Sequence, residues 1–201
     1  MFNEVLVLSP HTDDGELGAG GTIAKLVENG SKVTYFAFSA PKKILRTECK
    51  KCLEVLGVKE FEIFDFKVRH FPESRQDILE ILFEYNKEKK PDLILTPSTN
   101  DLHQDHQTIT NEALRAFKCS TIFGYELPWN NIVFMENCFI RLKERHVQKK
   151  IEALWNYKTQ ISKRHYFDKE YLIGLTRSRG AQIGVKYAEA FEAIKLVLDS
   201  F

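Results

Sequence analysis

The chain has 201 residues, of which 43% are hydrophobic and 12% aromatic, so it is long enough to bury one sizeable core. Its 29 basic and 28 acidic residues give a formal net charge of +1, which argues against nucleic acid as the main partner. No apolar run approaches the roughly 20 residues of a membrane span. The start, "MFNEVLVLSP", is too short and acidic for a signal peptide. We therefore expect a cytoplasmic protein with no membrane span.

Apolar strands alternate with amphipathic helices in the first part of the chain. We predict strands at 4–9, 32–40, 61–66 and 92–98. We predict helices at 21–30, 44–57, 75–90 and 106–117, with Gly30, Gly57 and Pro91 as stop signals. This alternation is typical of βαβ units with a parallel sheet. The prediction is an α/β, Rossmann-like three-layer fold, with a mostly parallel sheet and helices on both faces.

The pattern is weaker after residue 120. "TIFGYEL" and "IVFMENCFIRL" resemble strands, and "ERHVQKKIEALWNYKTQI" resembles a helix. The tail "SRGAQIGVKYAEAFEAIKLVL" has no clear period. Because there is no repeat, low-complexity tract or long linker, we expect a single domain over 1–201. Its motifs lie within 1–118, and the part from 119 to 201 is assigned less firmly.

Two short motifs have a structural interpretation. Cys49 and Cys52 form a CxxC, but the stretch has helical periodicity and no second CxxC exists, so we expect two ordinary core positions of a helix. The glycines of "LGAGG" (17–21) are spaced G-x-G-G and lie beside carboxylates, unlike a dinucleotide-binding loop. We interpret them as positions of close packing between a helix and a strand.

Two polar clusters follow predicted strands. "LSPHTDDGELGAGG" follows the first strand and "STNDLHQDHQT" the fourth. Their titratable residues are His11, Asp13, Asp14, Glu16, Asp101, His103, Asp105 and His106. Because the carboxyl ends of parallel strands meet at one edge of a sheet, we expect these side chains to lie together.

Imidazole and carboxylate groups at one sheet edge suit zinc or a similar divalent ion, held by three protein ligands with one open position. The remaining carboxylate and histidine would then move protons. The alternative is that Asp13 and Asp14 cap the next helix while the histidines lie on solvated loops. We expect Glu16 to be structural, bonded to backbone amides at the start of that helix.

These clusters resemble a known family. "PHTDDGELGAGGTIAKL" is similar to the P-H-x-D-D-x-E-x-G signature of the PIG-L/LmbE-like N-deacetylases, and "HQDHQT" to their H-P-D-H-x-x-T segment. "LRTECKKCLEVLGV" resembles their R-x-E helix, and "KPDLILTPS" the strand before their histidine loop. The resemblance runs from residue 4 to about 118. Thr12 and Gln104 stand where the family often has proline, and neither is a ligand position.

The resemblance implies a zinc-dependent hydrolase that removes the N-acetyl group from an amino sugar such as an N-acetylglucosamine conjugate, releasing acetate. The metal ligands it implies are His11, Asp14 and His106, with another divalent ion as an alternative to zinc. The catalytic residues it implies are Asp13 as general base, His103 as acid or oxyanion stabiliser, and Asp105 orienting His103.

Candidate substrate-binding residues are spread along the chain. Arg46 matches a family arginine that reaches the sugar, and Glu126, Trp129 and Asn130 lie where a site wall is expected. Trp129 would stack on a sugar or belong to the core. Arg177 and Arg179 are candidates for contacting a phosphate-bearing aglycone, or form a solvated surface.

Two other functions remain open from sequence alone. One is a non-catalytic metal- or sugar-binding module of the same fold, against which the intact base and acid positions argue. The other is a metal-dependent phosphoesterase, although the ligands suffice for one well-formed metal site. The expected partner is a small-molecule amino-sugar conjugate, and the sequence leaves a homo-oligomer open.

Overall fold

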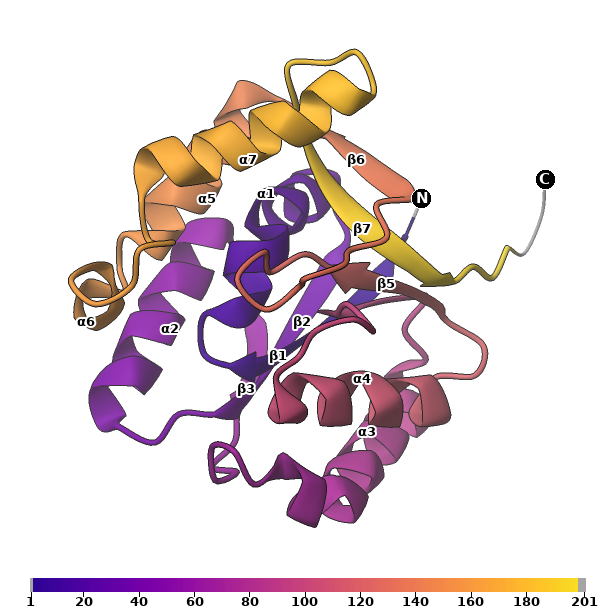
Figure 1. Ribbon diagram of the computed structural model, residues 1–201. Helices are drawn as coiled ribbons and strands as arrows, with labels where there is room; N and C mark the ends of the chain where they lie inside the picture. The colour runs from indigo at the N-terminus through magenta and orange to yellow at the C-terminus, as the bar shows by residue number, and fades with distance from the viewer. Residues whose placement is uncertain (1, 199–201) are drawn as a thin grey trace.

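The structure is a computed structural model that describes residues 2–198, built around a seven-stranded sheet (Figure 1). The strands are β1 (Glu4–His11), β2 (Lys32–Ser39), β3 (Glu60–Ile63), β4 (Leu93–Pro97), β5 (Thr121–Tyr125), β6 (Cys138–Leu142) and β7 (Tyr187–Lys195). Their order in the sheet is β3-β2-β1-β4-β5-β7-β6. The first five are mutually parallel, and β7 runs antiparallel to both of its neighbours. The mostly parallel sheet is confirmed.

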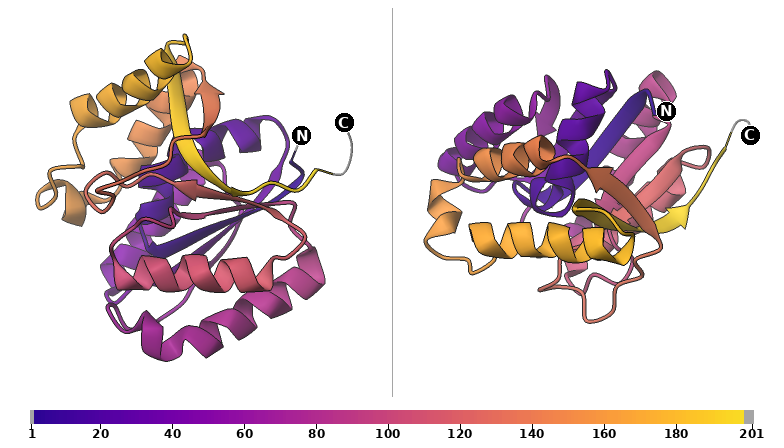
Figure 2. Two further views of the ribbon diagram at one scale, coloured as in Figure 1. Left: turned by 45° about the vertical axis from the view of Figure 1, so that its right-hand side comes forward. Right: turned by 90° about the horizontal axis from the view of Figure 1, so that it is seen from above.

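Helices cover both faces of the sheet (Figure 2). One face carries α1 (Asp14–Glu28), α2 (Lys43–Leu56), α5 (Glu144–Leu154), the short α6 (Lys158–Ile161) and α7 (Lys169–Gln182). The other carries the 3-10 turn η1 (Phe71–Ser74), α3 (Arg75–Lys89) and α4 (Gln104–Ala116). Each face has its own hydrophobic core, and β1 contributes Val5 and Val7 to one, Leu6 and Leu8 to the other. This explains the continuous apolar run of the central strand and confirms the three layers.

Helix α1 begins at Asp14, well before the predicted residue 21, because the glycine-rich segment is itself helical. A Cβ at Gly18 would overlap the Tyr125 ring, and one at Gly21 would overlap the Leu142 side chain. The glycines therefore permit close packing of α1 on the sheet, as predicted. The helix is bent at Ala19, where φ is −131° and ψ is 15°. Poor intrinsic helix propensity is overridden here by tertiary packing.

The C-terminal part differs most from expectation. The strand expected over 132–142 begins only at Cys138, and Ile132 and Val133 are 83% and 67% exposed on a loop. The helix expected over 144–161 is broken after Leu154, because Tyr157 turns inward and is fully buried. The tail contains both a helix, α7, and the strand β7. Cys49 and Cys52 are buried in α2, as predicted.

The strand order reverses direction between β1 and β4, which are neighbours in the sheet. In open α/β sheets this reversal leaves a crevice at the carboxyl ends of the two strands, where ligands bind. Both polar clusters of the sequence follow these two strands. Over the described residues, no helix is both long and apolar enough to cross a membrane.

Candidate active site

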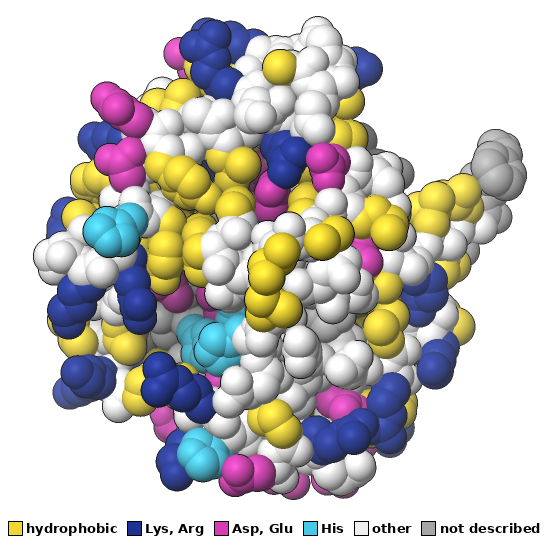
Figure 3. Space-filling view, viewed as in Figure 1, with side chains coloured by type: hydrophobic (Ala, Val, Ile, Leu, Met, Phe, Trp, Pro, Cys, Tyr) yellow, Lys and Arg dark blue, Asp and Glu magenta, His cyan; other side chains and the backbone are white. Residues whose placement is uncertain are grey.

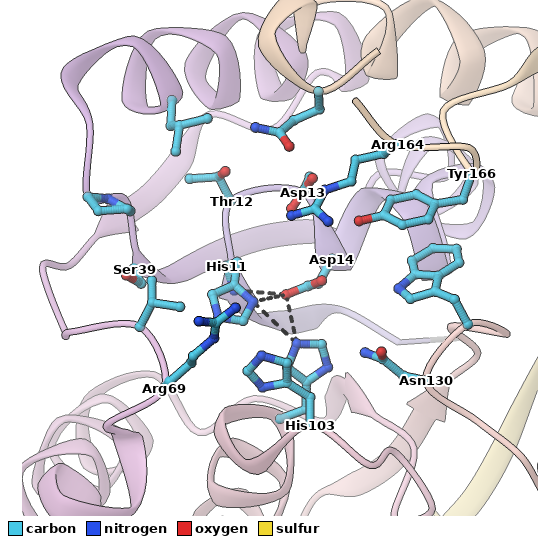
Figure 4. A pocket seen from close by; sticks show the side chains of 16 residues that line it. His11, Thr12, Asp13, Asp14, Ser39, Arg69, His103, Asn130, Arg164 and Tyr166 are labelled. Carbon is cyan, nitrogen blue, oxygen red and sulfur yellow. Dashed lines mark hydrogen bonds and ion pairs between the residues drawn. The ribbon is translucent and has the colours of Figure 1, made fainter. Parts of the chain in front are cut away.

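A pocket of about 350 Å³ opens at the carboxyl ends of β1 and β4 (Figure 4). His11 is the last residue of β1, and α1 begins three residues later at Asp14. From the other strand, the loop after β4 leads to His103, the N-cap of α4, and to His106 in its first turn. The pocket lining includes these four side chains and Asp13. The fold thus brings the two sequence clusters together.

Three of these side chains point one atom each at a common position. His11 Nδ1 lies 3.0 Å from Asp14 Oδ2, and His106 Nε2 lies 3.2 Å from the same oxygen. The two ring nitrogens are 3.3 Å apart. A tetrahedral ion with ligands at about 2.0–2.1 Å has ligand–ligand edges of about 3.3 Å. The triangle of His11, Asp14 and His106 therefore fits one face of a zinc-class coordination sphere.

Two further carboxylates orient the histidines of this triangle. Asp105 Oδ2 lies 3.1 Å from His11 Nε2, and Asp101 Oδ2 lies 2.7 Å from His106 Nδ1. Each histidine thus has one nitrogen held by a carboxylate and the other directed at the metal position, as in metal sites with carboxylate–histidine pairs. The sequence predicted that the Asp105 carboxylate orients His103. This carboxylate contacts His11 instead, and only the Asp105 backbone N–H bonds to His103. Asp101 belonged to the sequence cluster, but its role was not recognised there.

The charges around the triangle favour a cation. Burial lowers the pKa of His11, but the charge of Asp14 and the hydrogen bond to Asp105 outweigh it and raise the pKa to about 9. Burial likewise opposes protonation of His106, yet Asp14 and Asp101 raise its pKa to about 10. The cluster therefore stabilises positive charge on its histidines, and a divalent ion would supply such charge in their place.

Asp13 is the carboxylate that faces the pocket without belonging to the triangle. It occupies the N-cap position of α1, but its side chain makes no capping hydrogen bond, contrary to the alternative interpretation. Burial, assisted by the charge of Asp14, raises the pKa of Asp13 to about 7. A carboxylate with this environment, beside a metal position, is suited to accept a proton near neutral pH.

Glu16 lies behind the site and not in it. Its carboxylate is fully buried and accepts hydrogen bonds from the hydroxyls of Tyr157, at 2.8 Å, and Tyr35. Burial raises the pKa of Glu16 to about 8. Its structural role agrees with the sequence prediction, and its main partners are tyrosine hydroxyls, which the sequence did not reveal.

His103 is held by backbone and not by a carboxylate. Its Nδ1 accepts a hydrogen bond from the Asp105 backbone N–H at 3.2 Å, so the neutral ring carries its proton on Nε2. Burial and the nearby histidines lower the pKa of His103, which favours this neutral form. His11, His103 and His106 each offer a nitrogen within 4.8 Å of the others, a wider spacing than the triangle with Asp14.

Of the predicted substrate-binding residues, Trp129 and Asn130 line the pocket. The Trp129 ring is stacked on Tyr166, with centroids 3.7 Å apart and planes 10° from parallel. One face of the indole is therefore already covered by a side chain from the loop between α6 and α7. A sugar would have only the opposite face for stacking.

Arg46 does not line the pocket. Its Nη1 donates to the Ile63 carbonyl oxygen at 2.8 Å, and the guanidinium also pairs with Asp65. The side chain thus fastens α2 to the end of β3, and the substrate role that the resemblance implied for it finds no support. The pocket residue contributed by this helix is instead its neighbour Leu45.

Glu126 and Arg179 bind each other instead of lining the site. Arg179 Nε donates to Glu126 Oε2 at 2.9 Å, a second contact completes a two-pronged pair, and Arg179 Nη1 lies 3.2 Å from Glu136. Arg177 is exposed on α7 and outside the pocket lining. Arg177 and Arg179 therefore lie outside the lining of this pocket, and a phosphate contact at either residue stays a prediction.

The sequence did not single out several residues that the pocket contains. These are Ser39, Pro41, Leu45, Val68, Arg69, Gln160, Arg164 and Tyr166. They come from the end of β2 and the connection after it, from α2, from the connection between β3 and η1, from α6 and from the loop after α6. No shared spacing or motif links them. The basic stretch "SKRHY" (162–166) was the one local signal available for Arg164 and Tyr166.

Known proteins similar to this chain include deacetylases. The diacetylchitobiose deacetylase of Thermococcus kodakarensis is 33% identical over 126 residues, covering 53% of this chain and 47% of that protein. The chain thus matches about half the length of that relative. A protein of Escherichia coli named as the uncharacterized deacetylase YaiS is 27% identical over 169 residues, covering 77% of this chain and 90% of its own.

One protein of known structure with the same fold is named for a different activity. The 4-carboxy-2-hydroxymuconate hydratase GalB of Pseudomonas putida superposes with a TM-score of 0.84 at 21% identity, over 99% of each chain. This likeness shows the fold alone. The fold is thus shared by proteins of different chemistry, so the reaction has to be argued from the site.

The family assignment rests on the same segment that carries the site. The family model that matches this chain is PIG-L, described as GlcNAc-PI de-N-acetylase, and the match covers residues 6–117. This range includes both polar clusters, the metal triangle and its two orienting carboxylates. The chain belongs to the PIG-L family.

Proposed function

We propose that the protein is a metal-dependent hydrolase that removes the N-acetyl group from an N-acetylglucosamine-like sugar conjugate. The observation that carries this proposal is the triangle of His11, Asp14 and His106 with the uncapped carboxylate of Asp13 beside it in one pocket. The family and the deacetylase names of two relatives support the same reaction class.

The three atoms of the triangle would hold the metal ion, with zinc as our first choice because of the His₂Asp donor set. When bound, such an ion lowers the pKa of a water molecule from about 16 towards 7 and polarises an amide carbonyl. Asp101 and Asp105 fix the ring orientation of His106 and His11, so the ligands are positioned before the ion arrives.

Asp13 is the general base in this proposal. Its carboxylate accepts a proton from water while the water oxygen attacks the acyl carbon, and it then returns the proton to the departing amine nitrogen. The carbon–nitrogen bond breaks as the amine leaves. The products are acetate and the free amino sugar. The buried position of Asp13 beside the triangle, without a capping hydrogen bond, leaves its carboxylate free for both steps.

His103 is the hydrogen-bond donor to the amide oxygen. Because its Nδ1 is engaged by the Asp105 backbone N–H, its Nε2–H is available to the oxygen that gains negative charge during attack. The lowered pKa of His103 supports this role over that of a protonated acid. His103→Gln, which keeps a side-chain N–H donor, should therefore retain more activity than His103→Ala.

The test is a screen of N-acetylated amino-sugar conjugates for release of acetate and primary amine by zinc-loaded protein. Protein treated with a chelator is the control, and activity should return with added zinc. Release of phosphate from a phosphomonoester panel, with no acetate from any sugar, would favour the phosphoesterase alternative. Binding of the sugars without release of either product would favour a non-catalytic module.

A further inference from the structure

Two buried tyrosines hold the turn between β1 and α1, which carries Asp13. The Tyr157 hydroxyl contacts the Thr12 carbonyl oxygen, and the Tyr35 hydroxyl lies 3.4 Å from the same oxygen. Each hydroxyl also contacts one oxygen of the Glu16 carboxylate. Thr12, Glu16 and the two tyrosines are at most 3% exposed. Figure 3 shows histidine side chains in a hollow of the surface, but neither tyrosine lines the pocket, so neither touches a substrate there.

The Thr12 carbonyl oxygen controls the direction of Asp13. It belongs to the peptide group whose nitrogen is that of Asp13, and because this group is planar, anchoring the oxygen fixes the plane from which Asp13 extends. The first hydrogen bond of α1, from the Leu17 N–H at 3.0 Å, reaches only the next carbonyl, that of Asp13. The Asp13 side chain makes no capping hydrogen bond of its own. Its orientation therefore depends on the backbone that the tyrosines hold.

The neighbouring metal ligand has separate anchors. Asp14 Oδ2 accepts a hydrogen bond from the His11 backbone N–H at 2.8 Å, besides its contacts with the two histidine rings. The Gly15 N–H donates to Ser9 Oγ at 3.0 Å, which holds the start of α1 against β1. Loss of a tyrosine hydroxyl should therefore affect Asp13 more than Asp14.

Tyr157 connects this turn to a part of the chain outside the family match, which ends at residue 117. It lies at the start of α6, and Tyr166, in the loop after α6, lines the pocket. Helix α6 is also fastened to α2, because the Thr159 N–H and hydroxyl donate to the Glu48 carboxylate at 2.9 and 2.6 Å. Tyr157 thus joins a wall of the pocket to the turn that carries Asp13.

We propose that Tyr157 is a positioning residue, which holds the Thr12–Asp13 peptide group so that the Asp13 carboxylate is directed at the metal position. This inference rests on the proposed function. A displacement of about 1 Å in a reacting group can cost on the order of 100-fold in rate. Because the Tyr35 hydroxyl remains 3.4 Å from the Thr12 oxygen, loss of the Tyr157 hydroxyl should cost less, roughly 10-fold in kcat.

The experiment compares zinc-loaded wild type, Tyr157→Phe and Tyr125→Phe, at a temperature where all three are folded. The substrate is the N-acetylated sugar that wild type hydrolyses fastest in the screen. Tyr125→Phe is the matched control, because its hydroxyl is also buried and donates to a β1 carbonyl, that of Leu8 at 2.9 Å, outside the turn. We expect Tyr157→Phe to lower kcat roughly 10-fold with KM and zinc content unchanged, and Tyr125→Phe to keep the wild-type kcat.

An Asp13→Asn background separates positioning from general damage. If Tyr157 acts through Asp13, adding Tyr157→Phe to Asp13→Asn should change the residual kcat by less than about 2-fold. A full loss in that background, a wild-type kcat in Tyr157→Phe, or an equal loss in Tyr125→Phe overturns the positioning role and leaves the deacetylase proposal standing. Loss of zinc from Tyr157→Phe also overturns it, because the hydroxyl would then act on the metal ligands.

The anchor has a readout that does not require turnover. If wild type hydrolyses no sugar, the deacetylase proposal fails, and amide hydrogen exchange then tests whether Tyr157 holds the turn. The amides of residues 13–16 should exchange faster in Tyr157→Phe than in Tyr125→Phe, and equal rates would overturn the proposal. If Tyr157→Phe does not fold, Tyr35→Phe replaces it, with a smaller loss of kcat because its hydroxyl is the more distant of the two from the Thr12 oxygen.

Discussion

The floor and the rim of the pocket are built in different ways. At the floor, where the metal triangle lies, His106 is 1% exposed, and its two ring nitrogens are held by Asp101, in the loop after β4, and Asp14, the first residue of α1. At the rim, Arg69 and Arg164 extend from loops, and neither guanidinium forms an ion pair within the described residues. The contrast suggests that the sheet fixes the chemistry while the loops choose the substrate, so substitutions at the two levels should have different signatures.

The largest effect should come from removing a floor ligand. His106→Ala deletes one corner of the triangle, so bound zinc should fall well below one ion per chain and acetate release should fall to background. His103→Ala is the matched control, because His103 lies outside the triangle and should leave the metal content largely unchanged. Elemental analysis of both purified variants measures this. Equal zinc content in His106→Ala and wild type would contradict the ligand set.

The next effect separates two adjacent carboxylates. Asp13→Asn preserves shape but removes the base, so kcat should fall by roughly 100-fold or more with zinc still bound. Asp14→Asn should instead weaken zinc binding, because Asp14 Oδ2 contacts both His11 and His106. Turnover and zinc content, measured together, distinguish the two. An exchange of these phenotypes would reverse the roles that we assign.

A smaller effect is expected for the carboxylates that orient the ligands. Asp105→Asn and Asp101→Asn should each lower zinc affinity by roughly 10- to 100-fold. Asp105→Asn should also weaken the hydrogen bond that Asp105 accepts from the Arg69 backbone N–H, whereas Asp101→Asn should not. Asp65→Asn is the control, since Asp65 pairs with Arg46 outside the pocket. A zinc titration of the three variants measures this. If Asp65→Asn lowered the zinc affinity as much as the other two variants, the orienting role of Asp101 and Asp105 would be contradicted.

The smallest effect concerns the link between the C-terminal part and the floor. The Tyr157 hydroxyl contacts the Thr12 carbonyl oxygen and donates to Glu16, so Tyr157→Phe leaves buried acceptors with fewer partners and should cost about 1–2 kcal/mol in the free energy of unfolding. Tyr171→Phe is the control, because the Tyr171 hydroxyl is buried without a hydrogen-bond partner among the described residues. Denaturant unfolding should show little loss for Tyr171→Phe. A loss as large as that of Tyr157→Phe would contradict the explanation.

The floor was predictable from sequence because its parts are local. His11 and Asp14 are three residues apart at the end of one strand, and His106 follows another. A parallel sheet then requires the two strand ends to meet at one edge. The single-domain boundary, the cytoplasmic location and the oligomeric state stay predictions.

The partners of individual side chains were decided by the tertiary structure. Arg46, Arg179 and Arg69 look alike in sequence, yet the guanidinium groups of the first two pair with Asp65 and Glu126, while that of the third forms no ion pair within the described residues. Which carboxylate lies within reach depends on loop paths and helix ends, and these follow from packing across the whole chain. Sequence alone therefore determined which titratable side chains meet after the parallel strands, because the backbone geometry there is regular. The folded structure decided the rim, because contacts between distant segments have no local period to reveal them.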